Sequence, residues 1–331
     1  MDLRRLGSTN LVVTPIGLGL AALGRPGYIN LKHAEDLELN YEPNAMELRA
    51  HAVLDSAWQA GIRYFDAARS YGAAEAFLGS WLTSRQIQPE QVTVGSKWGY
   101  VYTAGWQVNA PVHEVKQHTP EVLRRQRQET DQNLGHYLKL YQIHSATLDS
   151  GVLENQAILA ELARYRAGGL TIGLSVSGSR QAETLYRAME IEADGRPLFQ
   201  SVQATWNMLE TSAGSALDAA HRQGMGVIIK EALANGRLTS KNDDPDFSQQ
   251  IYMLEDTAAE LGTTVDAMAL AAVLAQPWVD IVLSGATTSE QLLSNASALA
   301  VKWNDGLSRR FARLAMRPED YWASRSALSW N

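Results

Sequence analysis

Short runs of apolar residues recur along the chain and are separated by longer segments with helical spacing of apolar and charged positions. Most runs place Val, Ile or Leu at consecutive positions, which is typical of strands buried on both faces of a parallel sheet. Eight runs are recognisable, at residues 16–20, 63–67, 91–97, 140–146, 171–177, 201–206, 226–231 and 280–286. The pattern therefore predicts eight parallel strands.

The segments between the runs carry helix-end signals. Thr119-Pro120-Glu121 combines an N-cap residue, a proline at the first helical position and an acid in the first turn. The amphipathic segment 154–167 is followed by two glycines, which commonly end helices. Helices are thus expected to alternate with the strands.

Eight strand–helix units in 331 residues fit one (β/α)8 TIM barrel, an α/β fold of typically ~250 residues plus insertions. Segments 3–6 and 11–14 flank a polar, glycine-containing turn and predict an N-terminal β-hairpin before the barrel. Long loops are expected at 24–43 and 98–118, and extra C-terminal helices after residue 305. Because no linker interrupts the rhythm, residues 1–331 are expected to form a single domain.

One segment favours a different fold. GLGLAA at 17–22 matches the dinucleotide fingerprint G-x-G-x-x-A, with Glu35 and Asp36 roughly twenty residues further on. That fingerprint requires the glycine turn to open a helix. Gly24 and Pro26 follow at once and would break such a helix, so the barrel is the favoured interpretation.

Composition narrows the possible partners. Apolar residues make up 45% and charged residues 20% of the chain, which indicates a globular protein with a sizeable core. The net charge is -7 and no long cluster of Lys and Arg occurs, so nucleic acid and anionic membranes are not expected partners. The chain has no cysteine, and its histidines lack metal-ligand spacing, so no metal site is expected.

The chain also lacks recognisable targeting signals. The basic residues near the N-terminus are not followed by an apolar region, so they do not form a signal peptide. The longest apolar stretch, residues 267–275, is too short to span a bilayer. These features predict a soluble, cytoplasmic protein.

Four titratable side chains stand at the ends of neighbouring predicted strands. Asp66 and Tyr71 follow the second run, Lys97 ends the third, and His144 lies near the end of the fourth. In a TIM barrel the carboxyl ends of the strands converge on one face, where catalytic residues come from several strands. The four residues are therefore candidate catalytic groups. For Asp66 and Tyr71 the alternative is a helix-capping aspartate and a surface tyrosine.

The four side chains suit one kind of chemistry. A free phenol has a pKa of about 10, and a neighbouring lysine ammonium is expected to lower the pKa of Tyr71. Asp66 would hold Lys97, and His144 would hydrogen-bond the substrate oxygen. Such a set suits proton donation to a carbonyl oxygen while a cofactor supplies a hydride.

The sequence resembles the aldo-keto reductase superfamily over essentially its whole length. The segments that carry the resemblance are RRLGSTNLVVTPIGLG, FDAARSYGAAE, GSK, QIH, GLSVS, QATWN, EALANGRL and SGATTSEQLLSN, in the family's order on successive strands. The resemblance implies that Asp66, Tyr71, Lys97 and His144 form the catalytic tetrad, with Tyr71 as the general acid/base. It also implies a small carbonyl compound or alcohol as substrate.

The resemblance further implies a nicotinamide cofactor, NADP or NAD. Ser175 and Gln203 match residues that hold the nicotinamide carboxamide, while Leu233 and Gly236 lie in the loop that folds over the pyrophosphate. The positions that match the adenosine end are Gly285, Thr287, Thr288, Gln291 and Asn295.

The chain departs from the family at several cofactor positions. Val176 stands where Asn is frequent, and Lys230 replaces an aromatic residue that stacks on the nicotinamide, a contact that Trp206 could replace. Gly285 and Gln291 occupy the places of the Lys and Arg that usually grip the 2′-phosphate of NADP. Without a cation the stronger, charge-assisted hydrogen bonds are missing, so the preference between NADP and NAD stays open.

Aromatic residues in the long loops are candidates for substrate contact: Tyr28, Trp98, Tyr100 and Trp106. They suit sugars, aromatic aldehydes or quinones equally, and ordinary loop packing is the alternative. The leading hypothesis is an NAD(P)H-dependent oxidoreductase that reduces aldehydes or ketones to alcohols. The alternatives are an NAD-dependent sugar dehydrogenase and a cofactor-bound regulatory subunit. The sequence does not indicate the oligomeric state.

Overall fold

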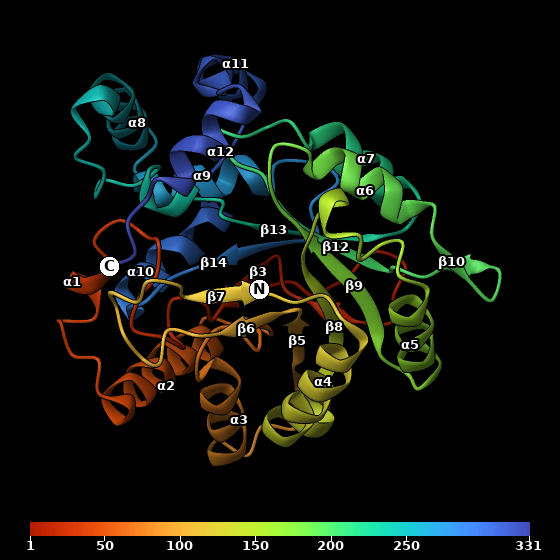
Figure 1. Cartoon of the computed structure of the whole chain (residues 1–331). Helices are drawn as coiled ribbons and strands as arrows, with labels where there is room; N and C mark the ends of the chain where they lie inside the picture. Colours follow the sequence, from red (N-terminus) through yellow and green to blue (C-terminus); the bar gives the residue numbers. More distant parts are fainter.

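Eight parallel strands form a closed barrel in the computed structural model, which describes residues 1–331 (Figure 1). The strands follow one another around the barrel in chain order, and β14 pairs with β3 to close it. Their bounds are β3 (Ile16–Gly19), β4 (Tyr64–Asp66), β5 (Thr93–Trp98), β8 (Leu138–Ala146), β9 (Thr171–Val176), β12 (Ser201–Thr205), β13 (Gly226–Lys230) and β14 (Ile281–Ser284). The predicted (β/α)8 TIM barrel is confirmed, and each predicted run overlaps one of these strands; β5 ends one residue after its run and β8 begins two residues before its run.

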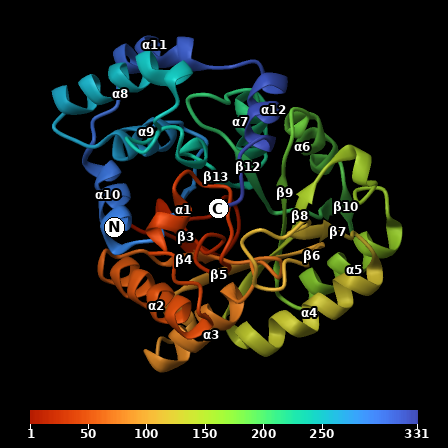
Figure 2. The same cartoon turned by 60° about the vertical axis from the view of Figure 1, so that its left-hand side comes forward.

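Helices surround the strands as an outer ring (Figure 2). In chain order they are α2 (Pro43–Gln59), α3 (Ala74–Ser84), α4 (Pro120–Leu134), α5 (Gln156–Ala167), α6 (Gln181–Met189), α7 (Gly214–Arg222), α8 (Ser248–Glu260), α9 (Val265–Leu274) and α10 (Ser289–Ala296). The expected C-terminal helices are α11 (Asp305–Phe311) and α12 (Pro318–Ser326), which share a buried apolar cluster with α8 and α9.

The helix ends follow the sequence signals closely. Thr119 caps α4, its hydroxyl accepting a hydrogen bond from Val122 N at 3.3 Å. Helix α5 begins two residues later than the amphipathic pattern suggested, because the Asn155 side chain is its N-cap and accepts from Ile158 N at 3.2 Å.

The two long loops contain structure that the sequence pattern missed. The first contains the four-residue helix α1 (His33–Asp36). The second folds into an antiparallel hairpin of β6 (Tyr100–Tyr102) and β7 (Glu114–Lys116). A further small hairpin, β10 (Glu192–Ala193) with β11 (Arg196–Pro197), precedes β12. These pairs are too short for periodicity to reveal them.

The N-terminal hairpin of β1 (Arg4–Arg5) and β2 (Val12–Val13) packs against the interior of the barrel. Leu6 and Val13 are fully buried in a cluster with barrel residues that include Tyr64 and Ile228. The turn approaches β13 so closely that a Cβ on Gly7 would lie 2.4 Å from Gly226 N. The hairpin therefore plugs the barrel at the starts of its strands, and the opposite end stays open for a site.

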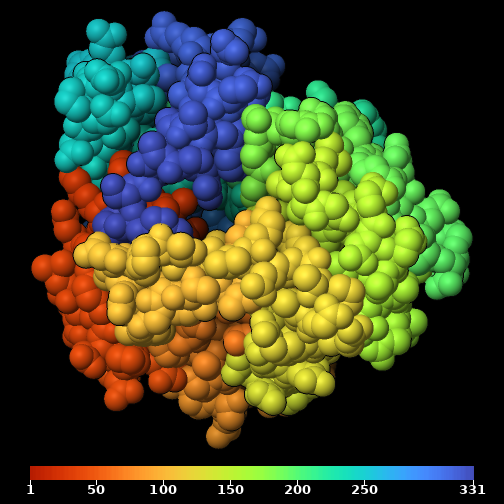
Figure 3. Space-filling model, in the orientation of Figure 1, coloured from red at the N-terminus to blue at the C-terminus, as the bar shows by residue number.

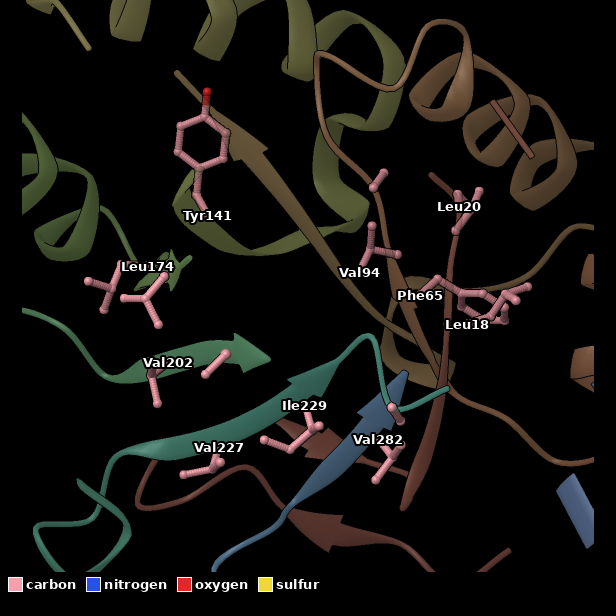
Figure 4. Close-up of a cluster of buried hydrophobic side chains, with 14 of the residues drawn as sticks. Leu18, Leu20, Phe65, Val94, Tyr141, Leu174, Val202, Val227, Ile229 and Val282 are labelled. Atoms are coloured by element: carbon pink, nitrogen blue, oxygen red, sulfur yellow. The ribbon is translucent and has the colours of Figure 1, made fainter. Parts of the chain in front are cut away.

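Barrel strands turn alternate side chains outward and inward. The outward side chains pack against the helices; Figure 4 shows Leu18, Phe65, Val94, Tyr141, Leu174, Val202, Val227, Ile229 and Val282 around the ring of strands. Asp66, Lys97, His144, Gln203 and Lys230 lie on the opposite face of their strands from these residues. Burial on both faces explains the consecutive apolar runs, and the alternation sends the polar strand-end residues into the barrel.

No single helix is long and apolar enough to cross a membrane. Residues Pro245–Glu260 and Val265–Leu274 reach the required length and apolar content only as a pair bent by 84°. Most of α9 is buried, including Met268 and Leu270, which accounts for its apolar sequence.

Candidate active site

A cavity of about 760 Å³ lies at the carboxyl ends of the barrel strands. Its lining extends from Asp66, Tyr71 and His144 at the barrel interior to Gln291 and Asn295 on α10. The volume is within the range of small-molecule and cofactor sites. One continuous cavity thus joins the predicted catalytic face to the predicted adenosine end.

The last residues of the chain cover one side of this cavity. Trp330 lines it and stacks on His113 of the second long loop, with ring centroids 3.8 Å apart. Asn331 pairs with Tyr28 through two backbone hydrogen bonds of 3.1 Å. Figure 3 shows the blue C-terminal segment meeting the yellow segment of the second long loop on this face. Two loops and the C-terminal segment therefore form the wall opposite the barrel.

Asp66 and Lys97 form a buried ion pair beneath the cavity. Their side chains are 2% and 0% exposed, and Lys97 Nζ also donates to Ala67 O at 3.0 Å. Asp66 Oδ1 accepts from Tyr64 OH at 3.2 Å, Gln142 Nε2 at 3.3 Å and Gln203 Nε2 at 3.0 Å. Four donors from four strands therefore converge on one carboxylate, which satisfies its charge.

The turn that carries Tyr71 is fixed by a buried carboxylate. Glu75, which is 0% exposed, pairs with Arg69 at 3.0 Å and accepts from Ser96 Oγ at 2.6 Å. The turn also packs on the first long loop: Ala73 N donates to Gly24 O at 2.7 Å, and a Cβ on Gly24 would lie 2.3 Å from Tyr71 O. Only glycine fits at position 24, so the two loops place Tyr71 together.

Tyr71 and His144 meet on the cavity wall. Tyr71 OH lies 3.3 Å from His144 Nε2, and Ser70 Oγ lies 3.3 Å from His144 Nδ1. The pairing of β8 with β9 shifts register between Ile143 and Ala146, and Ser145 adopts a positive φ of 50°. This irregularity resembles the β-bulges that re-aim side chains next to active sites.

Burial is the largest influence on the pKa of both His144 and Tyr71. Burial, together with the charges of Lys97 and Arg25, lowers the pKa of His144 well below its usual value, so this imidazole is neutral at pH 7. Burial, together with the charges of Asp66 and Glu114, raises the pKa of Tyr71 well above its usual value. The prediction that Lys97 lowers the pKa of Tyr71 is wrong for this structure. The ammonium, 4.9 Å from the ring centroid, is compensated by its ion pair with Asp66.

Arg25 is a cation at the site that sequence reasoning missed. It is 3% exposed, and its Nη1 donates to Ser70 O at 3.1 Å and to Glu114 Oε2 at 2.8 Å. Its guanidinium carbon lies 5.4 Å from the Tyr71 ring centroid, and its charge opposes the rise in the pKa of Tyr71. A single arginine in a glycine- and proline-rich loop carries no motif, so no sequence signal identified it.

A second missed cluster stands at the end of β13. Glu231 accepts from Arg325 Nε of α12 at 2.9 Å, and Lys230 Nζ lies 3.8 Å from Glu231 Oε1. Burial alone would raise the pKa of Glu231, but Arg325 and Lys230 outweigh it and lower the pKa to about 2. Burial lowers the pKa of Lys230 to about 8 against the opposing charge of Glu231. The pattern of a helical tail could not reveal that α12 supplies a cation to the cavity wall.

Comparison with known families agrees with this geometry. The family described as "Aldo/keto reductase family" matches residues 15–311, which is most of the chain. The chain belongs to the aldo/keto reductase family. Membership in this family identifies it as an oxidoreductase.

Individual relatives are distant but cover nearly the full length. A pyridoxal 4-dehydrogenase of Microbacterium luteolum is 26% identical, over 88% of this chain and 91% of its own. An NADH-specific methylglyoxal reductase of Escherichia coli (strain K12) is also 26% identical, over 91% and 94%. The holo form of an aldo-keto reductase from Bacillus halodurans has a TM-score of 0.71 at 18% identity, over 96% and 97%, which supports the fold.

The positions that this aldo/keto reductase was expected to use at the nicotinamide end have different surroundings. Gln203 and Lys230 line the cavity. Ser175 is fully buried, and its hydroxyl accepts from Ser145 N at 2.8 Å. Val176 and Trp206 lie in the apolar core, where they offer the cavity no polar contact or stacking face.

At the other end, most of the expected residues line the cavity: Leu233, Gly236, Gly285, Thr288, Gln291 and Asn295. Thr287 differs, because it is 1% exposed and its hydroxyl donates to Asp36 Oδ2 at 3.0 Å. The hydrogen-bond network orients Asn295 so that its amide donates to Asp266 Oδ2 at 2.8 Å and accepts from Ser284 Oγ at 2.8 Å. These internal bonds occupy polar groups that had been expected to face a ligand.

The four aromatic candidates separate into two groups. Tyr28 lines the cavity, and the ring of Tyr100 packs 5.0 Å from the ring of His144. Trp98 is fully buried against His118, and Trp106 donates to Tyr41 O at 2.6 Å. The structure therefore places Trp98 and Trp106 away from the cavity, where they pack the loop.

Proposed function

We propose that this protein is an NAD(P)H-dependent oxidoreductase that reduces aldehydes or ketones to alcohols, with Tyr71 as the proton donor. The observation that carries the proposal is the Tyr71 hydroxyl on the cavity wall, 3.3 Å from His144 Nε2. Family membership and the names of the relatives support it. Those relatives include a reductase and a dehydrogenase, so either direction is represented among them.

The residues of the cavity fit a nicotinamide dinucleotide. Gln203 uses its amide N–H on Asp66, so its amide oxygen is available to a carboxamide donor. The cations Lys230 and Arg325 line the wall near β13 and suit a pyrophosphate. A Cβ on Gly285 would meet no atom within 4 Å, so the wall before α10 is open to a bulky group. The first turn of α10 offers backbone N–H groups there.

When bound, the nicotinamide supplies the hydride. The chain's own groups handle the substrate oxygen and its proton. In the tautomer with Ser70 donating to His144 Nδ1, the Nε2–H can hydrogen-bond the carbonyl oxygen while Tyr71 OH donates its proton to it. The ammonium of Lys97 balances the charge of Asp66 beside the Tyr71 ring, so the phenolate that this transfer leaves does not face an unpaired carboxylate.

The protonated state of Tyr71 fits a proton donor, and we therefore prefer the reductive direction over the alternative sugar dehydrogenase. Because burial and Asp66 raise the pKa of Tyr71 well above its usual value, the phenol is protonated at neutral pH and ready to donate. A dehydrogenase would need Tyr71 as a base. We prefer an enzyme over the regulatory alternative because Asp66, Tyr71 and His144 line the cavity and Lys97 pairs with Asp66.

The test is the variant Tyr71→Phe, which removes only the hydroxyl. We expect kcat with an activated aldehyde to fall about 10²–10⁴-fold, with the dissociation constant of NADH or NADPH unchanged. Tyr252→Phe on α8, where the ring is 72% exposed, is the matched control and should leave both quantities unchanged. Retention of more than about a tenth of kcat in Tyr71→Phe would overturn the role of Tyr71. Cofactor binding by the wild type without turnover of any carbonyl compound would favour the regulatory alternative.

A further inference from the structure

The end of the cavity beside α10 carries more negative than positive charge. Its charged lining residues are the carboxylates Asp36, Asp266 and Glu290 and the ammonium of Lys241. The other cationic groups of the cavity, Arg25, Lys230 and Arg325, belong to the tyrosine and β13 side described above. A dianionic group placed beside α10 would therefore meet an excess of negative charge.

Asp36 is held in place at this end by two partners. Thr287 Oγ1 donates to its Oδ2 at 3.0 Å, and Lys241 forms an ion pair with its Oδ1. The side chain is 15% exposed, so it is largely enclosed but still reaches the cavity. An ionised carboxylate has about four acceptor sites, and these partners use two. Asp36 can therefore accept further hydrogen bonds from a ligand hydroxyl.

The loop that carries Asp36 is fixed to the loop after β13. Leu31 N donates to Asn235 O at 3.0 Å, and Lys32 Nζ lies 3.1 Å from Asp243 Oδ2. Asn331 Oδ1 accepts from Ala34 N at 3.2 Å. These contacts of neighbouring residues, together with those of Asp36 itself, fix the position of Asp36 at the start of α10.

We propose that Asp36 makes the enzyme select NAD(H) over NADP(H). Its carboxylate accepts a hydrogen bond from the 2′-hydroxyl of the adenosine ribose and repels the 2′-phosphate of NADP(H), which carries about -1.5 to -2 charge at pH 7. Thr287, which the resemblance placed at the adenosine end, orients the carboxylate that excludes the phosphate. This inference rests on the proposed function, because it requires a nicotinamide dinucleotide in the cavity.

The experiment compares dissociation constants by quenching of tryptophan fluorescence. The wild type should bind NADH about 10- to 100-fold more tightly than NADPH, the value of one hydrogen bond to a charged group. ADP-ribose and 2′-phospho-ADP-ribose, which lack the nicotinamide, should show the same order because the discrimination lies at the adenosine end. Asp36→Asn removes the charge and frees Lys241. It should therefore lower the dissociation constant of NADPH and reduce the preference for NADH by at least about tenfold.

Asp243→Asn is the matched control. It removes the other carboxylate that pairs the same two loops, yet its side chain is 81% exposed and does not line the cavity. The ratio should be unchanged in this variant. A wild-type preference for NADPH would overturn the proposal without any variant, and so would an unchanged ratio in Asp36→Asn and Asp36→Ala. Failure of the wild type to bind either dinucleotide would overturn the proposed function itself, and the role of Asp36 with it.

Discussion

We expect Asp66 to contribute more than Lys97 to the stability of the fold, and Lys97 to contribute more than Asp66 to activity. Asp66→Asn leaves one acceptor oxygen to face the four donors Lys97 Nζ, Tyr64 OH, Gln142 Nε2 and Gln203 Nε2, and adds an N–H₂ group among them. Lys97→Met leaves the carboxylate with three of its hydrogen bonds. We therefore expect Asp66→Asn to be the more destabilising change. Lys97→Met should reduce kcat more, because it leaves the charge of Asp66 unbalanced beside the Tyr71 ring, whereas Asp66→Asn removes that charge.

The structure sets the size of the two effects. Removal of one partner from a buried ion pair costs about 3–5 kcal/mol of unfolding free energy. The three hydrogen bonds that remain on Asp66 in Lys97→Met place this variant near ~3 kcal/mol, since hydrogen bonds to charged groups are worth about 1.5–3 kcal/mol each. Asp66→Asn has no such compensation and belongs near ~5 kcal/mol. The double variant Asp66→Asn/Lys97→Met removes both charges. Its loss in free energy of unfolding should therefore be smaller than the sum of the two single losses.

The assay is urea unfolding followed by circular dichroism and by fluorescence, with kcat measured on the same preparations. Asp218→Asn is the control, because its ion pair with Arg222 is exposed and such pairs contribute little. Unfolding of Lys97→Met at the same or a lower urea concentration than Asp66→Asn would contradict the prediction. Additive losses in the double variant would show that the two charges do not compensate each other in the fold.

Two further predictions concern charges at the cavity wall. The pKa of Glu231 is lowered from 4.5 to about 2, so its ion pair with Arg325 stabilises the fold at pH above 4.5 and this contribution is lost as the pH falls toward 2. Arg325→Met should therefore unfold at higher pH than the wild type in an acid titration followed by circular dichroism, whereas Arg187→Met, which breaks an exposed pair with Glu154, should not. Gln291→Arg should shift the ratio of NADPH to NADH affinity about tenfold toward NADPH through a charge-assisted pair. An unchanged ratio would place Gln291 away from the adenosine end, although it lines the cavity.

The barrel and its polar strand ends could be predicted because both depend on local sequence. A strand buried on two faces gives a consecutive apolar run, and the end of each run fixes where the side chains of Asp66, Lys97 and His144 emerge. Gln203 and Lys230, which the family resemblance indicated, also line the cavity from the ends of their strands. The direction in which each of these side chains points depends only on the register of its own strand.

The parts that were missed depend on contacts between segments far apart in the sequence. Arg25 becomes an active-site cation only because Glu114, in another loop, pairs with it at 2.8 Å. Asp36 reaches the end of the cavity beside α10, where Thr287, 251 positions later, binds it. No periodicity or motif spans such separations, so the sequence offered Asp36 only within a fingerprint for a different fold.

The pKa of Tyr71 shows why the composition of a site does not determine its electrostatics. Lys97 was expected to lower the pKa of the Tyr71 phenol. Instead Asp66 binds that lysine, and burial together with the charge of Asp66 leaves the phenol protonated. The cation whose charge does lower the pKa of Tyr71 is Arg25, from the first long loop. The Arg25 guanidinium also lies 4.8 Å from the Trp330 ring, so the first long loop and the C-terminal segment meet at the cation that lowers the pKa of Tyr71. Under the proposed role of Tyr71 as proton donor, the enclosure of the cavity and the acidity of Tyr71 are therefore linked through Arg25.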